Sequence, residues 1–272
     1  GHAEELSRPL SGQLVYSRLT HGTWQIWTTD LDTGERTQVT FSPGDKRYPT
    51  WTPDGRVIYH TSNSTCYLIA SPGEAPQRLL ADLGPIRYVA MSPDGGWLTF
   101  SRLEDGFIAN TDLWVASADG AQRRMITHDP GIQQDPAWSP DGTRIVYMGG
   151  RGYGADELYV VTADGTERRQ LTTNRARAAL PAWSPDGTRI AFNSDVSGDH
   201  EIWMIQPDGS SVMQLTQTPG LDTRPAWSPD GQHIAFTSNR SGVLEIWLMN
   251  ADGTDQRLLE QAEGGVCDPA WR

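Results

Sequence analysis

Six positions that recur along the chain carry side chains that could bind a ligand together. Successive positions lie 40 to 47 residues apart, and they are Tyr48, Tyr88, Asp135, Leu180, Arg224 and Asp268. Phenol, carboxylate and guanidinium groups could bind the polar groups of a protein or peptide, whereas a salt bridge between Arg224 and Asp268 is the structural alternative. Two carboxylates fall short of the roughly six to eight oxygens that calcium requires, so we expect no metal ion.

The sequence offers no arrangement typical of a catalytic nucleophile with its base. It contains neither a G-x-S-x-G elbow nor an H-E-x-x-H motif. Histidines outside the N-terminal tail are scattered singly, at positions 21, 60, 128, 200 and 233. The stretch GRGYGA from Gly150 has the letters of a dinucleotide fingerprint, but no helix is expected after it, so we interpret it as a flexible loop. We therefore expect a non-enzymatic binding module without a cofactor.

A repeated heptapeptide, PAWSPDG, explains why the six positions recur. Complete or related copies begin at residues 49, 89, 136, 181, 225 and 269. A period of this length is typical of architectures in which each repeat is one supersecondary unit that stacks on its neighbours.

Each repeat predicts four strands. In the copy at 222–260 the runs RPAWS, HIAFTS, EIWLMN and QRLLE are separated by turn residues. The turns SPDG and ADG use proline to preset φ and glycine to adopt positive φ. Tryptophan recurs in the first and third strands, which is typical of packing between sheets. The charged fourth strands suit an exposed edge.

Four-stranded units repeated radially predict an all-β propeller. We expect a six-bladed β-propeller of four-stranded blades. Its ring would be closed by the C-terminal strand, which would join an N-terminal three-stranded blade. Residues 1–10 are expected to be a cloning scar and an N-terminal tail, and residues 11–272 a single monomeric propeller.

The pattern PAWSPDG-x-x-IAF…EIW…ADG…RLT resembles the TolB-type propeller repeat, known also as the PD40 repeat, from Gly12 to Arg272. In that family the propeller is a protein-interaction platform of the bacterial periplasm that docks an outer-membrane peptidoglycan-associated lipoprotein. The resemblance implies a protein or peptide partner, with an envelope lipoprotein as a candidate, and a periplasmic or otherwise extracytoplasmic location. One alternative is an accessory or gating propeller of a prolyl oligopeptidase-like or tricorn-like peptidase. Another is a glycan-binding or polysaccharide lyase-related propeller, with Tyr153, Phe107 and Tyr48 as stacking candidates.

The connections between strands indicate where a binding site would lie. Turns after the first and third strands are uniform, whereas the connections after the second and fourth strands vary widely. Variable loops on a rigid scaffold usually carry binding, and the fourth-to-first connections would bring the recurring positions to the mouth of a central channel. We therefore predict a ligand-binding channel mouth formed by Tyr48, Tyr88, Asp135, Arg224 and Asp268.

Composition narrows the partners further. The formal net charge is −12, and no basic stripe is present, which argues against a nucleic-acid partner. No stretch approaches the roughly 20 apolar residues of a membrane span, and the start GHAEELSRPL has no apolar signal core, so we expect that any signal peptide was removed. Cys66 and Cys267 are expected to be free, half-buried thiols.

Overall fold

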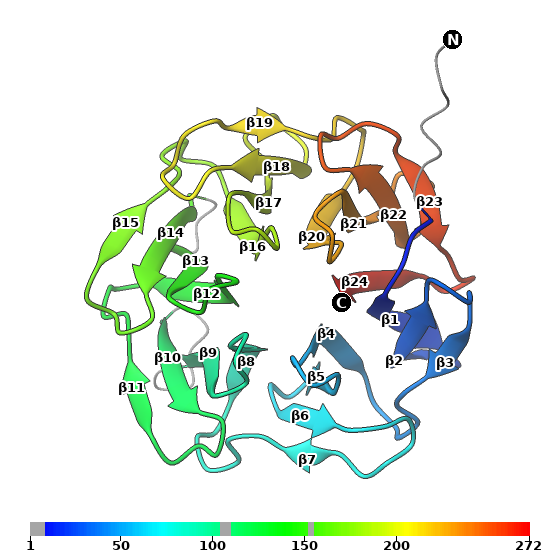
Figure 1. Cartoon of the computed structure of the whole chain (residues 1–272), viewed down its shortest axis with the longest axis horizontal. Coiled ribbons are helices and arrows are strands. Elements are labelled where there is room, and N and C mark those ends of the chain that lie inside the picture. Colours follow the sequence, from blue (N-terminus) through cyan, green and yellow to red (C-terminus); the bar gives the residue numbers. More distant parts are fainter. Residues whose placement is uncertain (1–8, 104–109, 152–154) are drawn as a thin grey trace.

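The computed structural model of the chain describes residues 9–103, 110–151 and 155–272. The regular structure in these ranges is β-sheet, with 24 strands. The sheets are arranged around a common centre, with the first strand of each repeat innermost and the fourth at the rim (Figure 1). The prediction of an all-β propeller is confirmed. None of the described residues forms a helix that is long and apolar enough to cross a membrane.

Four sheets have four strands each. One combines the C-terminal strand with three N-terminal strands, in the order β24 (Val266–Trp271), β1 (Gln13–Thr20), β2 (Thr23–Asp30) and β3 (Arg36–Gln38). The next contains β4 (Lys46–Trp51), β5 (Val57–Thr61), β6 (Cys66–Ile69) and β7 (Gln77–Arg78). A third contains β16 (Ala178–Trp183), β17 (Ile190–Ser194), β18 (Glu201–Ile205) and β19 (Met213–Gln214). The fourth contains β20 (Asp222–Trp227), β21 (His233–Ser238), β22 (Glu245–Asn250) and β23 (Arg257–Glu260).

The remaining sheet has eight strands. Its first half contains β8 (Ile86–Met91), β9 (Trp97–Leu103), β10 (Thr111–Ser117) and β11 (Arg123–Met125). Its second half contains β12 (Ile132–Trp138), β13 (Arg144–Gly150), β14 (Glu157–Thr162) and β15 (Arg168–Gln170). Neighbouring strands within each half are antiparallel, and the halves are joined by one parallel pair, Thr111 with Ile132.

The repeated turns adopt the conformation that their residues predict. Gly187 of the SPDG turn at 184–187 has φ of +70°, which glycine tolerates because it lacks a Cβ. Ser184 Oγ donates to Asp186 Oδ1 at 2.6 Å, and the backbone N–H of Thr188 donates to the same oxygen at 3.0 Å. These hydrogen bonds lower the pKa of Asp186 to about 2. The turn is therefore fixed by its own side chains.

The tryptophans of the innermost strands join neighbouring repeats, as predicted. Trp183 is buried in a cluster that contains Val146 of β13 and Ile190 of β17. Its indole Nε1 donates to the carbonyl oxygen of Ala137 in β12 at 3.2 Å. Trp51, Trp138 and Trp227 make the same kind of bond to the preceding innermost strand. Each of these side chains thus combines apolar packing with a hydrogen bond to the neighbouring repeat.

Cys66 and Cys267 are free, as expected, but the prediction that they are half-buried is wrong. Each is only 1% exposed. Both lie on β-strands whose side chains point into the packed core, where burial raises the pKa of each thiol.

Candidate functional site

A repeated backbone distortion sets the direction of the six recurring side chains. All six residues have positive φ, between 53° and 59°: Tyr48, Tyr88, Asp135, Leu180, Arg224 and Asp268. The pairing of each innermost strand with its neighbour shifts register at the same point, as in a β-bulge. A bulge turns one side chain away from the regular pleat, and a left-handed conformation at a non-glycine residue costs about 1 kcal/mol or more. The fold therefore contains this unfavourable backbone conformation at six equivalent positions.

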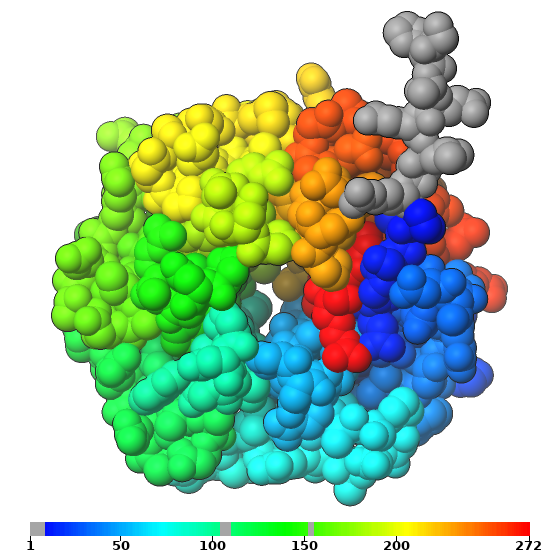
Figure 2. Space-filling view, in the orientation of Figure 1, coloured from blue at the N-terminus to red at the C-terminus, as the bar shows by residue number. Residues whose placement is uncertain are grey.

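The six side chains line one cavity of about 210 Å³ at the centre of the molecule. Figure 2 shows the central hollow, beside the C-terminal segment drawn in red. The predicted convergence of Tyr48, Tyr88, Asp135, Arg224 and Asp268 is therefore present, with Leu180 among them. Their role in ligand binding stays a prediction.

Asp268 is the centre of an ion network at the channel mouth. Its side chain is 3% exposed, with Oδ1 2.9 Å from Arg224 Nε and Oδ2 2.7 Å from Arg47 Nε. Burial alone would raise the pKa of Asp268, but the two guanidinium groups outweigh burial and lower it. The salt bridge between Arg224 and Asp268 that the sequence offered as a structural alternative is thus present, with Arg47 as an additional partner.

Two tyrosines form an aromatic wall beside this network. The ring centroids of Tyr48 and Tyr88 are 5.9 Å apart, with an interplanar angle of 43°. The guanidinium carbon of Arg224 lies 4.2 Å from the Tyr48 centroid, which is a cation–π contact. Burial, together with the charge of Asp135, raises the pKa of Tyr88 to about 12. Tyr48 therefore contacts both the Tyr88 ring and the arginine.

Asp135 is buried with incomplete hydrogen bonding. Its Oδ2 accepts a hydrogen bond from the backbone N–H of Leu180 at 3.3 Å, whereas Oδ1 has no hydrogen-bond partner among the described residues. Burial raises the pKa of Asp135, although the charge of Arg224 opposes this effect. The two predicted carboxylates therefore differ, since Asp268 is stabilised as an anion and Asp135 is not.

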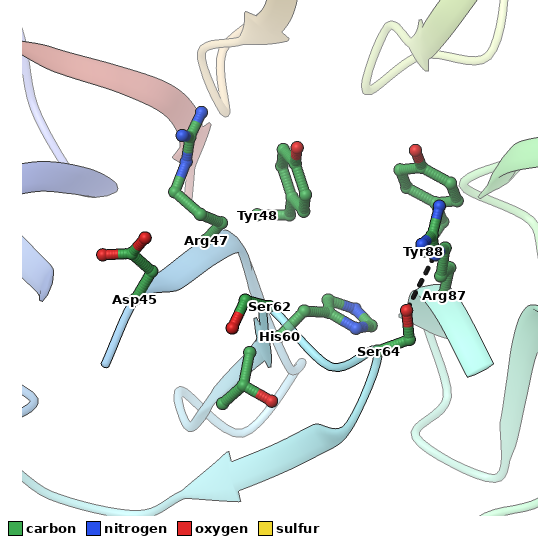
Figure 3. Close-up of a pocket in the computed structure, with 9 residues that line it drawn as sticks. Asp45, Arg47, Tyr48, His60, Ser62, Ser64, Arg87 and Tyr88 are labelled. Atoms are coloured by element: carbon green, nitrogen blue, oxygen red, sulfur yellow. Dashed lines mark hydrogen bonds between the residues drawn. The ribbon is translucent and has the colours of Figure 1, made fainter. Parts of the chain in front are cut away.

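A second cavity, of about 240 Å³, opens beside the channel mouth and shares Tyr48, His60 and Tyr88 with it. We call it the Arg87 pocket; its lining residues are Asp45, Arg47, Tyr48, His60, Thr61, Ser62, Ser64, Arg87 and Tyr88. Figure 3 shows Arg87 hydrogen-bonded to Ser64 on one side of this pocket, and Arg47 and Asp45 on the other. The pocket is thus formed by the β5–β6 connection and the two innermost strands β4 and β8.

His60 lies between the two sides of the Arg87 pocket (Figure 3). It is 4% exposed, and its Nε2 accepts a hydrogen bond from the backbone N–H of Val89 at 3.3 Å. Burial, with the charges of Arg87 and Arg224, lowers the pKa of His60 to about 4. The ring is therefore neutral with its proton assigned to Nδ1, which has no hydrogen-bond partner in the described part of the chain.

Sequence reasoning missed Arg47, Arg87 and His60. A signal for the arginines was present, because each tyrosine of the channel mouth directly follows an arginine, in KRY and IRY. No comparable signal marks His60, whose place depends on how β5 lies against β8. Among the described residues no group of three or more His, Cys, Asp or Glu side chains could hold a metal ion. Tyr153 and Phe107, named as glycan-stacking candidates, lie outside the described residues.

Comparisons with known proteins agree with this architecture. Residues 157–272 match the family model of the TolB β-propeller domain, PD40. A Tol-Pal system protein TolB from Anaeromyxobacter dehalogenans is 36% identical over 120 residues, which cover 43% of this chain and 27% of that protein. The chain thus matches about a quarter of the length of this relative.

Solved structures share the fold over nearly the whole chain. TolB from Acinetobacter baumannii has a TM-score of 0.82 at 22% identity, covering 97% of this chain and 67% of that one. An oligogalacturonate lyase from Vibrio parahaemolyticus has a TM-score of 0.63 at 14% identity, covering 94% and 79%. At these identities the two structures support the fold alone. The family match over residues 157–272 and the relative from Anaeromyxobacter show that this chain is similar to TolB-type β-propeller proteins with PD40 repeats.

Proposed function

We propose that this chain is a six-bladed propeller that binds a protein or peptide partner at the face carrying the channel mouth. Six blades are supported by the division of the eight-stranded sheet into two antiparallel halves that meet at one pair, Thr111 with Ile132. The pairing of β24 with β1 supports a closing blade made from both ends of residues 11–272.

The observation that carries the binding role is the convergence of six different side chains on one cavity. The scaffold repeats the same strained bulge six times, yet fills it with phenol, carboxylate, guanidinium and aliphatic groups. Strained backbone at a concave site is typical of functional positions, because packing alone would be satisfied by relaxed residues. Different groups at equivalent positions also give the mouth an asymmetric pattern that one partner can recognise.

The names of the relatives support the kind of partner. The curated relative from Anaeromyxobacter is a Tol-Pal system protein, which favours a protein partner of this chain over a small metabolite. An envelope lipoprotein is the candidate that we propose, together with a periplasmic location and a monomeric state.

A binding role requires no catalytic step, and we propose that the propeller itself is non-enzymatic. The alternatives were an accessory propeller of a peptidase and a glycan-binding or lyase-related propeller. The lyase from Vibrio shares the fold alone, and no contact of the described residues favours either alternative over protein binding.

Two matched tryptophan substitutions test the proposed face. Ser62 is exposed and lines the Arg87 pocket, whereas Glu167 is exposed in the β14–β15 turn among the uniform turns. Uniform turns of both kinds share the opposite face, where Ala163 and Pro140 line one cavity. Ser62→Trp should lower the affinity for a partner recovered from native extract by about tenfold or more, since the indole would occupy the site. Glu167→Trp should leave affinity unchanged.

Isothermal titration calorimetry with that purified partner measures both variants. The proposed face is wrong if Glu167→Trp weakens binding while Ser62→Trp does not. A partner that binds both variants as tightly as the native protein would place the docking surface away from the channel mouth and from the uniform turns.

A further inference from the structure

The arginines at the channel mouth differ in how their charges are compensated. Arg47 and Arg224 both form ion pairs with Asp268. Arg87 forms no ion pair with an acidic side chain anywhere in the described ranges; its Nε donates instead to Ser64 Oγ at 2.8 Å. Because Nε is already bonded, the terminal Nη nitrogens of Arg87 remain as donors for a further group.

The described surroundings of Arg87 are rich in hydrogen-bond donors, and their one carboxylate does not pair with Arg87. Asp45 is the carboxylate among the described lining residues; it lies on the other side of the pocket from Arg87 (Figure 3) and accepts a hydrogen bond from the backbone N–H of Trp24 at 2.9 Å. His60 is neutral, with an N–H that lacks a partner among the described residues, and Ser62 and Ser64 contribute hydroxyls. The described lining thus carries two guanidinium groups and one carboxylate, in a chain of net charge −12.

We propose that the Arg87 pocket binds a carboxylate group carried by the docked partner, and that Arg87 determines this specificity. The inference rests on the proposed function, because the partner at the channel mouth supplies the carboxylate. A guanidinium group binds a carboxylate through two parallel hydrogen bonds, and the Ser64 contact holds the guanidinium in place before the ligand arrives. Arg87 would then be a binding residue, and Ser64 a positioning residue.

The size of the pocket sets the size of the bound group. Its volume of about 240 Å³ is below the roughly 300–1,000 Å³ of sites for drug-sized ligands, so it suits one residue of a peptide. Tyr48 and Tyr88 supply the apolar wall against which the rest of that residue would pack. One uncompensated guanidinium beside a neutral imidazole matches the single charge of a carboxylate better than the double charge of a phosphate. The carboxylate could come from an acidic side chain or from a chain terminus.

Small-molecule probes test the pocket without the natural partner. The side-chain Nε–H signal of Arg87 would be followed by NMR in the ¹⁵N-arginine-labelled protein. N-acetylglycine represents a chain terminus, N-acetylglutamic acid α-amide an acidic side chain, and N-acetylglycinamide a neutral control. We expect a saturable shift of the Arg87 signal with at least one acid, at about millimolar affinity, and none with the neutral amide. The tighter of the two acids identifies the source of the carboxylate.

Substitutions then assign the binding to Arg87. Arg87→Gln should abolish saturable binding of the acid, followed in uniformly ¹⁵N-labelled protein through the backbone amides of neighbouring residues. Arg87→Lys keeps the charge but loses the two-pronged geometry, so affinity should fall by about tenfold. Ser64→Ala should weaken binding less. Arg56→Gln is the matched control, because Arg56 pairs with Asp54 in a turn far from the pocket. If Arg87→Gln fails to fold, the affinities of Arg87→Lys and Ser64→Ala for the acid still test whether Arg87 binds it.

The inference is overturned by any of three results: no saturable shift with either acid up to about 100 mM, an equal shift with the neutral amide, or undiminished binding in Arg87→Gln. Failure of the proposed function is a separate outcome. If the acids bind at Arg87 but the partner binds Ser62→Trp as tightly as the native protein, the carboxylate site is supported and the proposed docking face is contradicted. If Ser62→Trp weakens partner binding but neither acid binds at Arg87, only the carboxylate inference is contradicted.

Discussion

Arg224 and Asp268 occupy equivalent positions of neighbouring innermost strands, and Nε of Arg224 lies 2.9 Å from Oδ1 of Asp268. Asp268 is 3% exposed, so its charge depends on this arginine and on Arg47. The pair therefore links β20 to β24 at the channel mouth, and it contributes to stability whether or not a ligand binds.

Replacing Arg224 should destabilise the fold. Arg224→Met removes one of two cations from a buried carboxylate, and we expect the free energy of unfolding to fall by about 1–3 kcal/mol. Urea denaturation measures the change. Arg56→Met is the control: its ion pair with Asp54 is exposed, so the loss should stay below about 0.5 kcal/mol. Equal losses in the two variants would show that the buried pair contributes no more than a surface pair.

The buried carboxyl of Asp135 should make stability depend on pH. Its pKa is raised in the folded protein, so its favourable contribution is fully present below the unfolded pKa of about 4 and is lost as pH rises through the folded pKa. Asp135→Asn removes this titration. The variant should therefore gain stability relative to the native protein between about pH 4 and pH 7, with no relative gain near about pH 3. Urea midpoints across this range provide the measurement.

Asp268→Asn is the control of opposite sign. The pKa of Asp268 is lowered in the folded protein, so its contribution is present above the unfolded pKa and is lost as pH falls through the folded pKa. This variant should be less stable than the native protein at neutral pH, and the difference should shrink on acidification. A pH-independent difference for either variant would contradict the assigned environment of that carboxyl.

Deleting residues 268–272 should destabilise the sheet that joins the two ends of the propeller. The deletion removes the pairs of Leu14 with Trp271 and of Val15 with Ala270, and exposes the apolar face of β1. We expect a loss of about 3 kcal/mol or more, because ladder hydrogen bonds and core burial are lost together. Arg272→Ala, which removes an exposed contact with Gln13 and a cation–π contact with Trp51, should change stability by no more than about 1 kcal/mol. A truncated protein that unfolds at the same urea concentration as the native chain would argue against a closing blade.

The local structure of each repeat could be predicted from the sequence. The runs HIAFTS and EIWLMN coincide with β21 (His233–Ser238) and β22 (Glu245–Asn250), while β20 begins at Asp222, two residues before the predicted RPAWS. Turn chemistry operates over a few neighbouring residues, and the positive φ of Gly187 follows from the SPDG turn alone. Convergence of the six channel positions was also predictable, because equivalent positions of stacked repeats must occupy equivalent places around the centre.

Only the tertiary structure decided how those positions interact. Arg47 and Asp268 are 221 residues apart, and they meet because β24 lies next to the sheet of β4. The left-handed backbone at Tyr48 and Leu180 was not predictable from residue type, since neither residue favours positive φ and the bulge is imposed by strand pairing. Arg87 likewise forms no ion pair among the described residues because the fold places no carboxylate close enough to its guanidinium group. Repeat spacing therefore determined the shared architecture, and contacts between distant repeats determined which charged groups at the channel mouth form ion pairs and which do not.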